Sequence, residues 1–193
     1  SAMTADFDHD GDLDVVSAAR DDGRIIWYRN NAGSPPAFEP ILIGIVSGAY
    51  MAYPADLNRD GRADIVVGAV GVVDPSASEE SAALGTGAVV WFENNRQPAP
   101  GFTQRTIASG LNYPVSVRVA DVDSDGDPDV LVASRDDHTV RWFEHNGAAA
   151  PEFSGRVISS NANGAVSVDA GELDGDGDID IASASENDDK IAW

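Results

Sequence analysis

The sequence predicts a single all-β domain with the architecture of a β-propeller, in which small antiparallel sheets repeat around a common axis. Three observations lead to this fold class. An acidic nine-residue pattern with a central glycine occurs four times along the 193 residues. Each copy is followed by a short apolar run that is typical of a buried strand. Each unit of about 50 residues holds enough such runs for four strands, which is the composition of a propeller blade.

The spacing of the acidic pattern defines the repeats. Its copies begin at residues 6, 56, 121 and 172, so that successive copies are 50, 65 and 51 residues apart. We therefore expect one repeat domain over residues 1–193, with repeats at approximately 4–48, 49–110, 111–163 and 164–193. Stacked repeats share a continuous core, and a hydrophobic content of 42% is sufficient to form one.

The third repeat shows the expected order of elements most clearly. Residues 115–119 alternate in polarity and predict a first strand before the acidic pattern. The apolar residues 130–133 predict a second strand, and a polar turn separates them from a third strand at 140–143. Phe153 then precedes a fourth strand at 156–159, and Phe38 and Phe102 hold the same place in earlier repeats.

The two terminal repeats are expected to be incomplete. The first repeat begins almost directly at its acidic pattern and is predicted to lack a first strand, while the fourth ends at Trp193 and lacks a last strand. The expected total is 14 strands, so that two chains would supply 28, or seven blades of four. A homodimer that completes the ring is therefore one possibility, and a self-closed monomer of four blades or an incomplete arc are the alternatives.

Two further segments stand apart from the repeat pattern. Residues 71–86 form an insertion in the second repeat, and a capping-box sequence at 76–79 is equally compatible with a short helix and with a loop. Residues 1–3 resemble a remnant of an expression vector, which suggests that the chain is a piece of a longer protein.

The acidic pattern has the composition of a cation-binding loop. In its third copy, the side chains of Asp121, Asp123 and Asp125 converge when the chain curls, and Gly126 permits the sharp turn. The backbone carbonyl of Asp127 can face the same point, and the carboxylate of Asp129 closes the cage. Hard oxygen ligands in a flexible loop favour Ca²⁺ over a transition metal or Mg²⁺.

We expect up to four such Ca²⁺ sites, one in each repeat. In all of them, positions one, three, five and nine supply side chains and position seven supplies its carbonyl. The candidate ligands are Asp6, Asp8, Asp10, Asp12 and Asp14 in the first loop; Asp56, Asn58, Asp60, Arg62 and Asp64 in the second; Asp121, Asp123, Asp125, Asp127 and Asp129 in the third; and Glu172, Asp174, Asp176, Asp178 and Asp180 in the fourth.

The loops do not follow the EF-hand pattern. An EF-hand requires a bidentate glutamate at the twelfth loop position and a helix on each side. That position is occupied here by Ser17, Val67, Val132 or Ser183, and strands rather than helices follow.

With these residues in view, the chain resembles the FG-GAP/VCBS repeats of integrin α-subunit propellers and of many secreted bacterial proteins. The resemblance rests on D-x-D-x-D-G-x-x-D between two strands and on the segment DVLVASRDDHTVRWFEHNG, and it extends over essentially the whole chain. It implies a Ca²⁺-binding propeller that acts in adhesion or ligand binding. Two residues depart from the pattern: Asn58 is a neutral ligand that weakens the second site, and Glu172 is longer than aspartate and changes the geometry of the fourth.

The charge and the cysteine content limit the function classes. The formal net charge is −21, and eighteen of the 33 acidic residues lie in the four loops. Four Ca²⁺ ions would still leave a charge of −13, which argues against nucleic acid or an anionic membrane as a partner. There is no cysteine and no apolar run long enough to span a membrane. Because weak Ca²⁺ sites fill only outside the cytosol, we expect a secreted or cell-surface protein.

No set of residues in the sequence indicates catalysis, so we expect a non-catalytic module that binds a protein or a glycan. The three histidines, His9, His138 and His145, have no spacing that builds a triad or a transition-metal site. The alternative is a partial propeller from a polysaccharide-degrading enzyme, with its catalytic groups in the insertion at 71–86.

Aromatic residues recur at fixed places in the repeats. Trp27, Trp91, Trp142 and Trp193 are predicted to pack between neighbouring blades, with sugar stacking as the alternative. Tyr50, Tyr53 and Tyr113 lie next to the first strands of their repeats and are candidates for lining a binding face.

Overall fold

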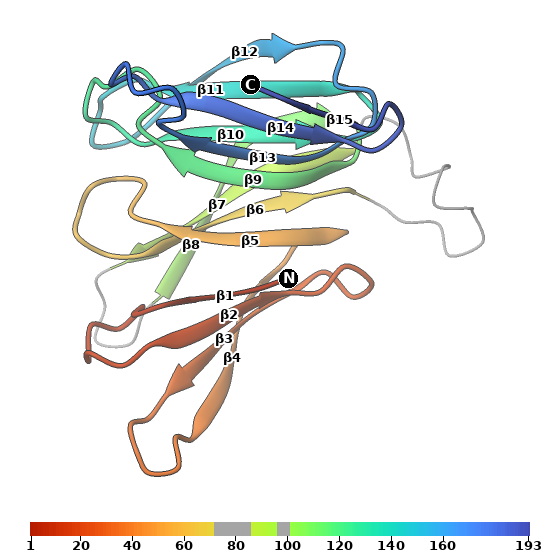
Figure 1. The fold of residues 1–193 in the computed structure, drawn as a ribbon. Coiled ribbons are helices and arrows are strands. Elements are labelled where there is room, and N and C mark those ends of the chain that lie inside the picture. Colours follow the sequence, from red (N-terminus) through yellow and green to blue (C-terminus); the bar gives the residue numbers. More distant parts are fainter. Residues whose placement is uncertain (72–85, 96–100) are drawn as a thin grey trace.

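The chain is an all-β propeller-type structure. A computed structural model describes residues 1–71, 86–95 and 101–193. Over these residues the chain forms fifteen strands in four antiparallel sheets, which follow one another from the N-terminus to the C-terminus. Figure 1 shows the sheets stacked face against face as the blades of a fan, from red to blue. The predicted fold class is confirmed.

Each of the first three sheets has four strands in chain order, and the fourth has three. The first sheet contains β1 (Ala2–Ala5), β2 (Asp14–Ala18), β3 (Arg24–Asn30) and β4 (Phe38–Ile45). The second contains β5 (Ala49–Ala55), β6 (Asp64–Ala69), β7 (Gly87–Asn95) and β8 (Gly101–Leu111). The third contains β9 (Pro114–Ala120), β10 (Asp129–Ser134), β11 (Thr139–His145) and β12 (Phe153–Ser159). The fourth contains β13 (Ala165–Gly171), β14 (Asp180–Ser185) and β15 (Lys190–Ala192).

The first sheet corrects the prediction that the first repeat lacks its first strand. Ala2–Ala5 forms β1 and pairs antiparallel with β2, with Met3 opposite Val16. The expected total of 14 strands is therefore wrong, because the described residues already contain fifteen. The proposed ring of two chains depended on a total of 28 strands, and that support is lost.

The first strand of each sheet is the innermost one. β1 contacts β5, β5 contacts β9, and β9 contacts β13, so that these four strands line the inner side of the arc. The second strand of every sheet begins at the last residue of an acidic loop: Asp14, Asp64, Asp129 and Asp180. This arrangement carries the four loops to the same end of the arc, at the left of Figure 1.

The second strands of the second and third sheets are buried on both faces, since each of these two sheets packs between two others. Along β10, Val130 and Val132 contact the second sheet, while Leu131 and Ala133 contact the fourth. Alternate side chains of a strand point to opposite faces, so that one strand contributes to two cores. The apolar side chains between successive sheets form three clusters. Burial on both faces explains why the sequence is continuously apolar along such a strand.

The interpretation of the tryptophans as packing residues is confirmed where a following sheet exists. Trp27 and Trp91 are buried, and Trp142 packs against the cluster between the third and fourth sheets. Phe102, from the last strand of the second sheet, lies edge-on to Trp27 with ring centroids 6.5 Å apart. Trp193 is 71% exposed, because no fifth sheet covers it in this chain.

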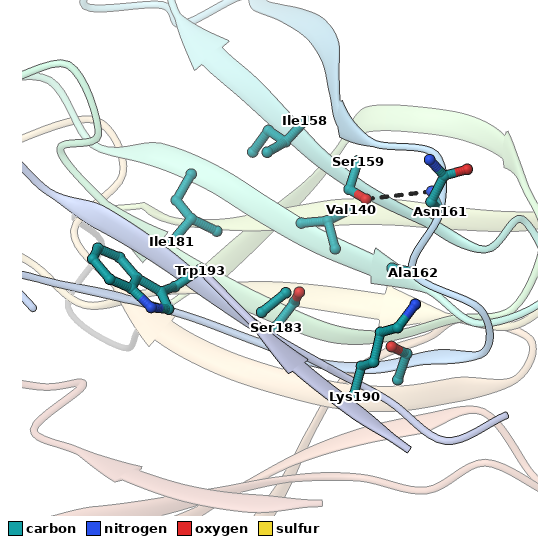
Figure 2. Close-up of a pocket in the computed structure, with 11 residues that line it drawn as sticks. Val140, Ile158, Ser159, Asn161, Ala162, Ile181, Ser183, Lys190 and Trp193 are labelled. Atoms are coloured by element: carbon teal, nitrogen blue, oxygen red, sulfur yellow. Dashed lines mark hydrogen bonds between the residues drawn. The ribbon is translucent and has the colours of Figure 1, made fainter. Parts of the chain in front are cut away.

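The fourth sheet ends the arc with an unpaired edge at β15. Beside it, a pocket of about 250 Å³ lies between the third and fourth sheets. Figure 2 shows Val140, Ile158 and Ile181 around this pocket, with Trp193 at its rim. Ile191 is also exposed, so apolar surface collects at this edge.

The insertion of the second repeat lies between β6 and β7. The capping box at 76–79 and the helix expected to follow it fall on residues 72–85, which lie outside the described part of the chain. Within the described ranges, no helix is long and apolar enough to cross a membrane.

Candidate metal centres

The four acidic loops share one backbone conformation. Position four is left-handed in every loop, with φ of 60° at His9, 56° at Arg59, 61° at Ser124 and 87° at Gly175. Position six is a glycine with φ between 85° and 94° in every loop. A glycine adopts such a value without the steric cost that a side chain would add, so its recurrence is explained by the turn itself.

Side-chain to backbone hydrogen bonds hold the loops curled. In the first loop, the backbone N–H of Gly11 donates to Oδ2 of Asp6 at 3.0 Å, and that of Asp12 donates to Oδ1 of Asp10 at 2.9 Å. The third loop repeats both bonds, from Gly126 to Asp121 and from Asp127 to Asp125. Aspartates in such turns satisfy backbone donors that no strand partner can reach.

The aspartate at position nine is a structural residue as well as a candidate ligand. Oδ2 of Asp129 accepts the N–H of Val122 at 3.1 Å, and its Oδ1 accepts the N–H of His145 at 2.8 Å. Asp14 and Asp64 make the same pair of bonds in their own sheets. Each of these three carboxylates is buried and ties the loop to the end of the third strand.

Carboxylates converge in three of the four loops. Within the described residues, three sets of side chains bring one oxygen each to within 4.8 Å of the other two. These sets are Asp6, Asp8 and Asp10; Asp121, Asp123 and Asp129; and Glu172, Asp174 and Asp180. Position five belongs to such a set only in the first loop, although Asp10 and Asp125 each accept the backbone N–H of the residue two positions later.

The first and third loops also hold buried oxygens that need a partner. Oδ1 of Asp6, Oδ1 of Asp8 and Oδ1 of Asp121 are buried, and no hydrogen-bond donor of the described residues satisfies them. A buried and unpaired carboxylate oxygen is costly, whereas a cation at the centre of the loop would coordinate it. The residues present therefore fit a hard divalent cation bound by oxygen ligands.

The second loop differs from the other three although its backbone is the same. Oδ1 and Oδ2 of Asp56 accept the N–H groups of Asp60 and Gly61 at 2.9 and 2.8 Å. Nδ2 of Asn58 lies 3.4 Å from Oε1 of Glu93, so the amide is oriented by a neighbouring strand. The side chain at position three is neutral, and both carboxylate oxygens of Asp56 accept hydrogen bonds from the backbone. The oxygens of Asp56 therefore have hydrogen-bond partners without a bound ion.

Burial, and to a smaller extent neighbouring carboxylates, raises the pKa of three aspartates in the loops. Burial, followed by the charges of Asp10, Asp14 and Asp6, raises the pKa of Asp8 above its ordinary value. Burial raises the pKa of Asp64 to about 7 and also raises that of Asp129. Raised carboxyl pKa values mean that the folded loops retain protons that the unfolded chain releases, and a bound cation would reverse this preference.

Glu172 at position one distinguishes the fourth loop from the other three, which have aspartate there. Its two carboxylate oxygens accept the backbone N–H groups of Gly175 and Gly177, whereas those of Asp56 in the second loop accept the N–H groups of Asp60 and Gly61. These bonds lower the pKa of Glu172, with the Gly175 bond as the largest cause. The loop lies on the exposed end of the arc, so its carboxylates face solvent rather than a neighbouring sheet.

The side chains at position seven behave differently from one another. Asp12 and Arg62 are partly buried and Asp178 is exposed, whereas Asp127 is buried. The carboxylate of Asp127 forms an ion pair with Arg59 of the second loop at 2.6 Å. The sequence pattern predicts only a carbonyl ligand at position seven and does not reveal this link between two loops. The signal was Arg59 at position four, where the other loops carry histidine, serine or glycine.

Two of the three histidines accept hydrogen bonds from backbone N–H groups. Nδ1 of His138 accepts the N–H of Gly164 at 3.0 Å, and Nδ1 of His145 accepts the N–H of Gly147 at 2.9 Å. His145 is buried, with its ring edge-on to Phe153. Both rings therefore have structural partners.

Comparison with known proteins agrees with this geometry. A family model described as FG-GAP-like repeat matches residues 6–67, 80–132 and 121–183. No curated protein matched the sequence. Among solved structures, the chain is similar to a lectin of Agrocybe aegerita that specifically recognises non-reducing terminal N-acetylglucosamine, with a TM-score of 0.57 and 18% identity.

That structural match covers 95% of this chain and 46% of the lectin, so the chain spans less than half of the length of the lectin. At such low identity the likeness concerns the fold. The repeat model, in contrast, covers all four acidic loops and most of the sequence. The chain belongs to the family of FG-GAP-like repeat proteins.

Proposed function

We propose that the chain is part of an extracellular, non-catalytic propeller that is stabilised by Ca²⁺ and binds a glycan or a protein. The observation that carries the proposal is the set of buried, unpaired oxygens of Asp6, Asp8 and Asp121 within carboxylate clusters. A cation there would satisfy these oxygens and cancel the repulsion within each cluster. A cluster of three carboxylate oxygens within one loop favours Ca²⁺ over a metal that prefers nitrogen or sulfur ligands.

Two features support an extracellular location, and the absence of cysteine is compatible with it. Loops of this kind bind Ca²⁺ with an affinity that suits the millimolar concentrations outside cells. The chain contains no cysteine, so ions rather than disulfides would join the first two strands of each sheet. FG-GAP-like repeats, the family to which this chain belongs, are typically found in extracellular proteins.

The binding role is supported by architecture. Propellers present loops from several blades at each end of the arc, where small ligands and protein segments can contact more than one sheet. The lectin with a similar fold recognises a terminal sugar, which shows that this architecture can carry glycan recognition. For this chain, a non-catalytic role is further supported by His138 and His145, whose Nδ1 atoms accept backbone hydrogen bonds.

Calcium titration of the protein stripped with EDTA tests the proposal. We expect at least two Ca²⁺ ions to bind by calorimetry, together with a rise in melting temperature. A ligand that binds only the folded state stabilises it by about 4 kcal/mol at a thousandfold excess over its dissociation constant. The paired variants Asp8→Ala and Asp123→Ala should each remove one ion, because position three faces the centre of its cluster.

Glu152→Ala is the matched control, since Glu152 is an exposed acidic residue outside the loops. It should leave the number of bound ions unchanged. If Ca²⁺ neither binds nor raises the melting temperature, the calcium part of the proposal is wrong. A glycan array in Ca²⁺, followed by an assay for released product on every hit, tests the binding part, and turnover of a hit would contradict the non-catalytic role.

A further inference from the structure

We propose that a pocket at the end of the arc opposite the acidic loops binds a sugar that carries a carboxylate. The inference rests on the proposed binding function and assigns it a site and a ligand class. The pocket, here called the Arg/Tyr pocket, is lined by Arg20, Tyr50, Tyr113, Val115, Arg135, Val166 and Glu186.

The position of the Arg/Tyr pocket follows from the topology. Tyr113 directly precedes β9, whereas the third acidic loop follows that strand. Arg20 and Arg135 come after β2 and β10, whereas the acidic loops come before them. The two kinds of site therefore occupy opposite ends of the same strands. All four sheets contribute, with Arg20 from the first, Tyr50 from the second, Tyr113 and Arg135 from the third, and Glu186 from the fourth.

The backbone at Tyr113 breaks the repeat pattern. In three successive sheets, the residue before the first strand is left-handed and its carbonyl accepts a hydrogen bond from the residue after the second strand. Gly48 and Gly164 hold this place in the second and fourth sheets, with φ of 71° and 73°. The third sheet has Tyr113 with φ of 56°. A left-handed tyrosine costs about 1 kcal/mol or more, and such strain concentrates at ligand sites.

Tyr113 contacts three other side chains that line the pocket. Its ring is buried, and the ring of Tyr50 lies 6.3 Å from it, centroid to centroid. The guanidinium carbons of Arg20 and Arg135 lie 5.5 and 5.6 Å from its centroid. Cation–π contact thus brings both guanidinium groups to one ring, and both arginines line the pocket. Tyr113 therefore occupies the position at which the second and fourth sheets have glycine, and its ring contacts both arginines.

Two arginines at one site are notable in this chain. It has twelve lysines and arginines against 33 acidic residues. Arg135 also forms an ion pair with Glu186 from the fourth sheet, which fixes its guanidinium at the pocket wall. A planar guanidinium recognises a carboxylate through two parallel hydrogen bonds. The two arginines concentrate positive charge at this pocket of an acidic protein, and Glu186 and Asp136, which lies 3.8 Å from Arg135, balance part of it.

The other walls of the pocket suit a sugar ring. Tyr50 is 39% exposed and offers an aromatic face, and the carboxylate of Glu186 can accept hydrogen bonds from hydroxyl groups. The pocket has a volume of about 180 Å³ and adjoins one of about 310 Å³, with which it shares Arg20, Tyr50 and Val115. A pocket of this size fits a single acidic sugar unit at the end of a glycan better than an extended acidic peptide.

Titration with matched sugars tests the inference. The probes are the methyl glycosides of glucuronic acid, galacturonic acid and N-acetylneuraminic acid, each paired with its methyl ester, followed by ligand-observed NMR and calorimetry in Ca²⁺. At least one acid should bind about tenfold more tightly than its ester. Arg20→Met should weaken that binding by at least about tenfold, because it removes a guanidinium and keeps the length of the side chain.

Arg24→Met is the matched control. It removes the same charge from the same hairpin, but Arg24 pairs with Asp22 and does not line the pocket. It should change the affinity less than about twofold. Tyr50→Ala, at a partly exposed position, provides a second binding variant whose folding is checked by its melting temperature. It should also weaken binding by at least about tenfold.

Three outcomes would overturn the inference: none of the acids binds, each ester binds as tightly as its acid, or Arg20→Met and Arg24→Met have equal effects. Tighter binding of hexaglutamate than of every sugar would assign the pocket to acidic peptides instead and would also overturn it. Failure of the proposed function looks different, because it would appear as loss of Ca²⁺ binding, which the pocket variants leave intact. A neutral glycan that binds independently of Arg20 would support the function and contradict this site.

Discussion

The second acidic loop has the same backbone conformation as the first and third loops, but it differs from them in whether its carboxylate oxygens are left unpaired. All three have left-handed residues at positions four and six, and all three bury the aspartate at position nine. Only the first and third leave carboxylate oxygens buried and unpaired. The second has Asn58 at position three and satisfies both oxygens of Asp56 with backbone N–H groups.

This difference separates two roles that the nine-residue pattern combines. Glycine at position six and hydrogen bonds to positions one and nine form the loop, and they are present with or without a charged cluster. The carboxylates at positions one and three determine whether a cation is required. The loop fold is therefore expected to survive in the second repeat even where its affinity for Ca²⁺ is low.

The largest effect is expected from Asp129→Ala. This change leaves the buried N–H groups of Val122 and His145 without acceptors, at a cost of about 1–3 kcal/mol for each group. The loss in unfolding free energy should appear in EDTA as well as in Ca²⁺, and urea denaturation measures it. Asp125→Ala, an exposed neighbour, is the comparison. Equal losses for the two variants in EDTA would show that position nine has no structural role.

A pH effect is expected at Asp64. Its pKa is raised to about 7 in the folded state by burial, while the unfolded chain ionises near its ordinary value of 3.8. Between these values the folded state holds more protons than the unfolded state, so stability in EDTA should fall as the pH rises from about 4 to 7. Asp64→Asn lacks the titrating proton and should lose less stability over this range. Parallel pH profiles of melting temperature for the two proteins would contradict the assignment.

The effect of a substitution in the second loop on the free energy of unfolding should change sign when Ca²⁺ is added. Asn58→Asp gives this loop the carboxylates of the first loop and places a new charge next to Glu93. In EDTA the variant should be less stable than the wild type by about 1 kcal/mol, because like charges repel. In excess Ca²⁺ it should be at least as stable and should bind the ion more tightly at one site by calorimetry. Asn58→Ala, which adds no ligand, should show no gain with Ca²⁺.

The smallest effect is expected at position seven. Asp127→Ala removes the ion pair with Arg59, whose side chain is half exposed, and should cost about 1 kcal/mol or less. Asp12→Ala makes the same change in the first loop. Neither variant should alter the number of bound Ca²⁺ ions, since only the backbone carbonyl of this position is assigned to the ion. An ion lost in either variant would show that the side chain is a ligand.

Much of the fold and of the loops was predictable because it depends on local rules. Glycine at position six marks a left-handed turn, and four copies of D-x-D-x-D-G-x-x-D define the repeat. β1 was not predicted, because Ala2–Ala5 lacks the β-branched and aromatic residues that favour strands, apart from Thr4. It forms through pairing with β2, which is a tertiary contact.

The features that the sequence did not reveal join different repeats. The ion pair between Arg59 and Asp127 links residues from two loops, and the Arg/Tyr pocket draws on all four sheets. Tyr113 was considered as a binding residue, but its left-handed backbone becomes significant only when Gly48 and Gly164 are seen to be its equivalents. Contacts of this kind depend on how the sheets stack, which no local pattern encodes.

The central claim is that the first and third loops hold Ca²⁺ and that the second holds it least well. Anomalous diffraction from crystals grown in Ca²⁺ tests it most directly, because it locates each ion and gives its occupancy. We predict fully occupied Ca²⁺ sites in two clusters, with oxygen distances of about 2.3–2.6 Å. The first cluster consists of Asp6, Asp8 and Asp10, and the second of Asp121, Asp123 and Asp129. The site beside Asn58 should have a lower occupancy. Ordered first and third loops without an ion, or highest occupancy in the second loop, would contradict it.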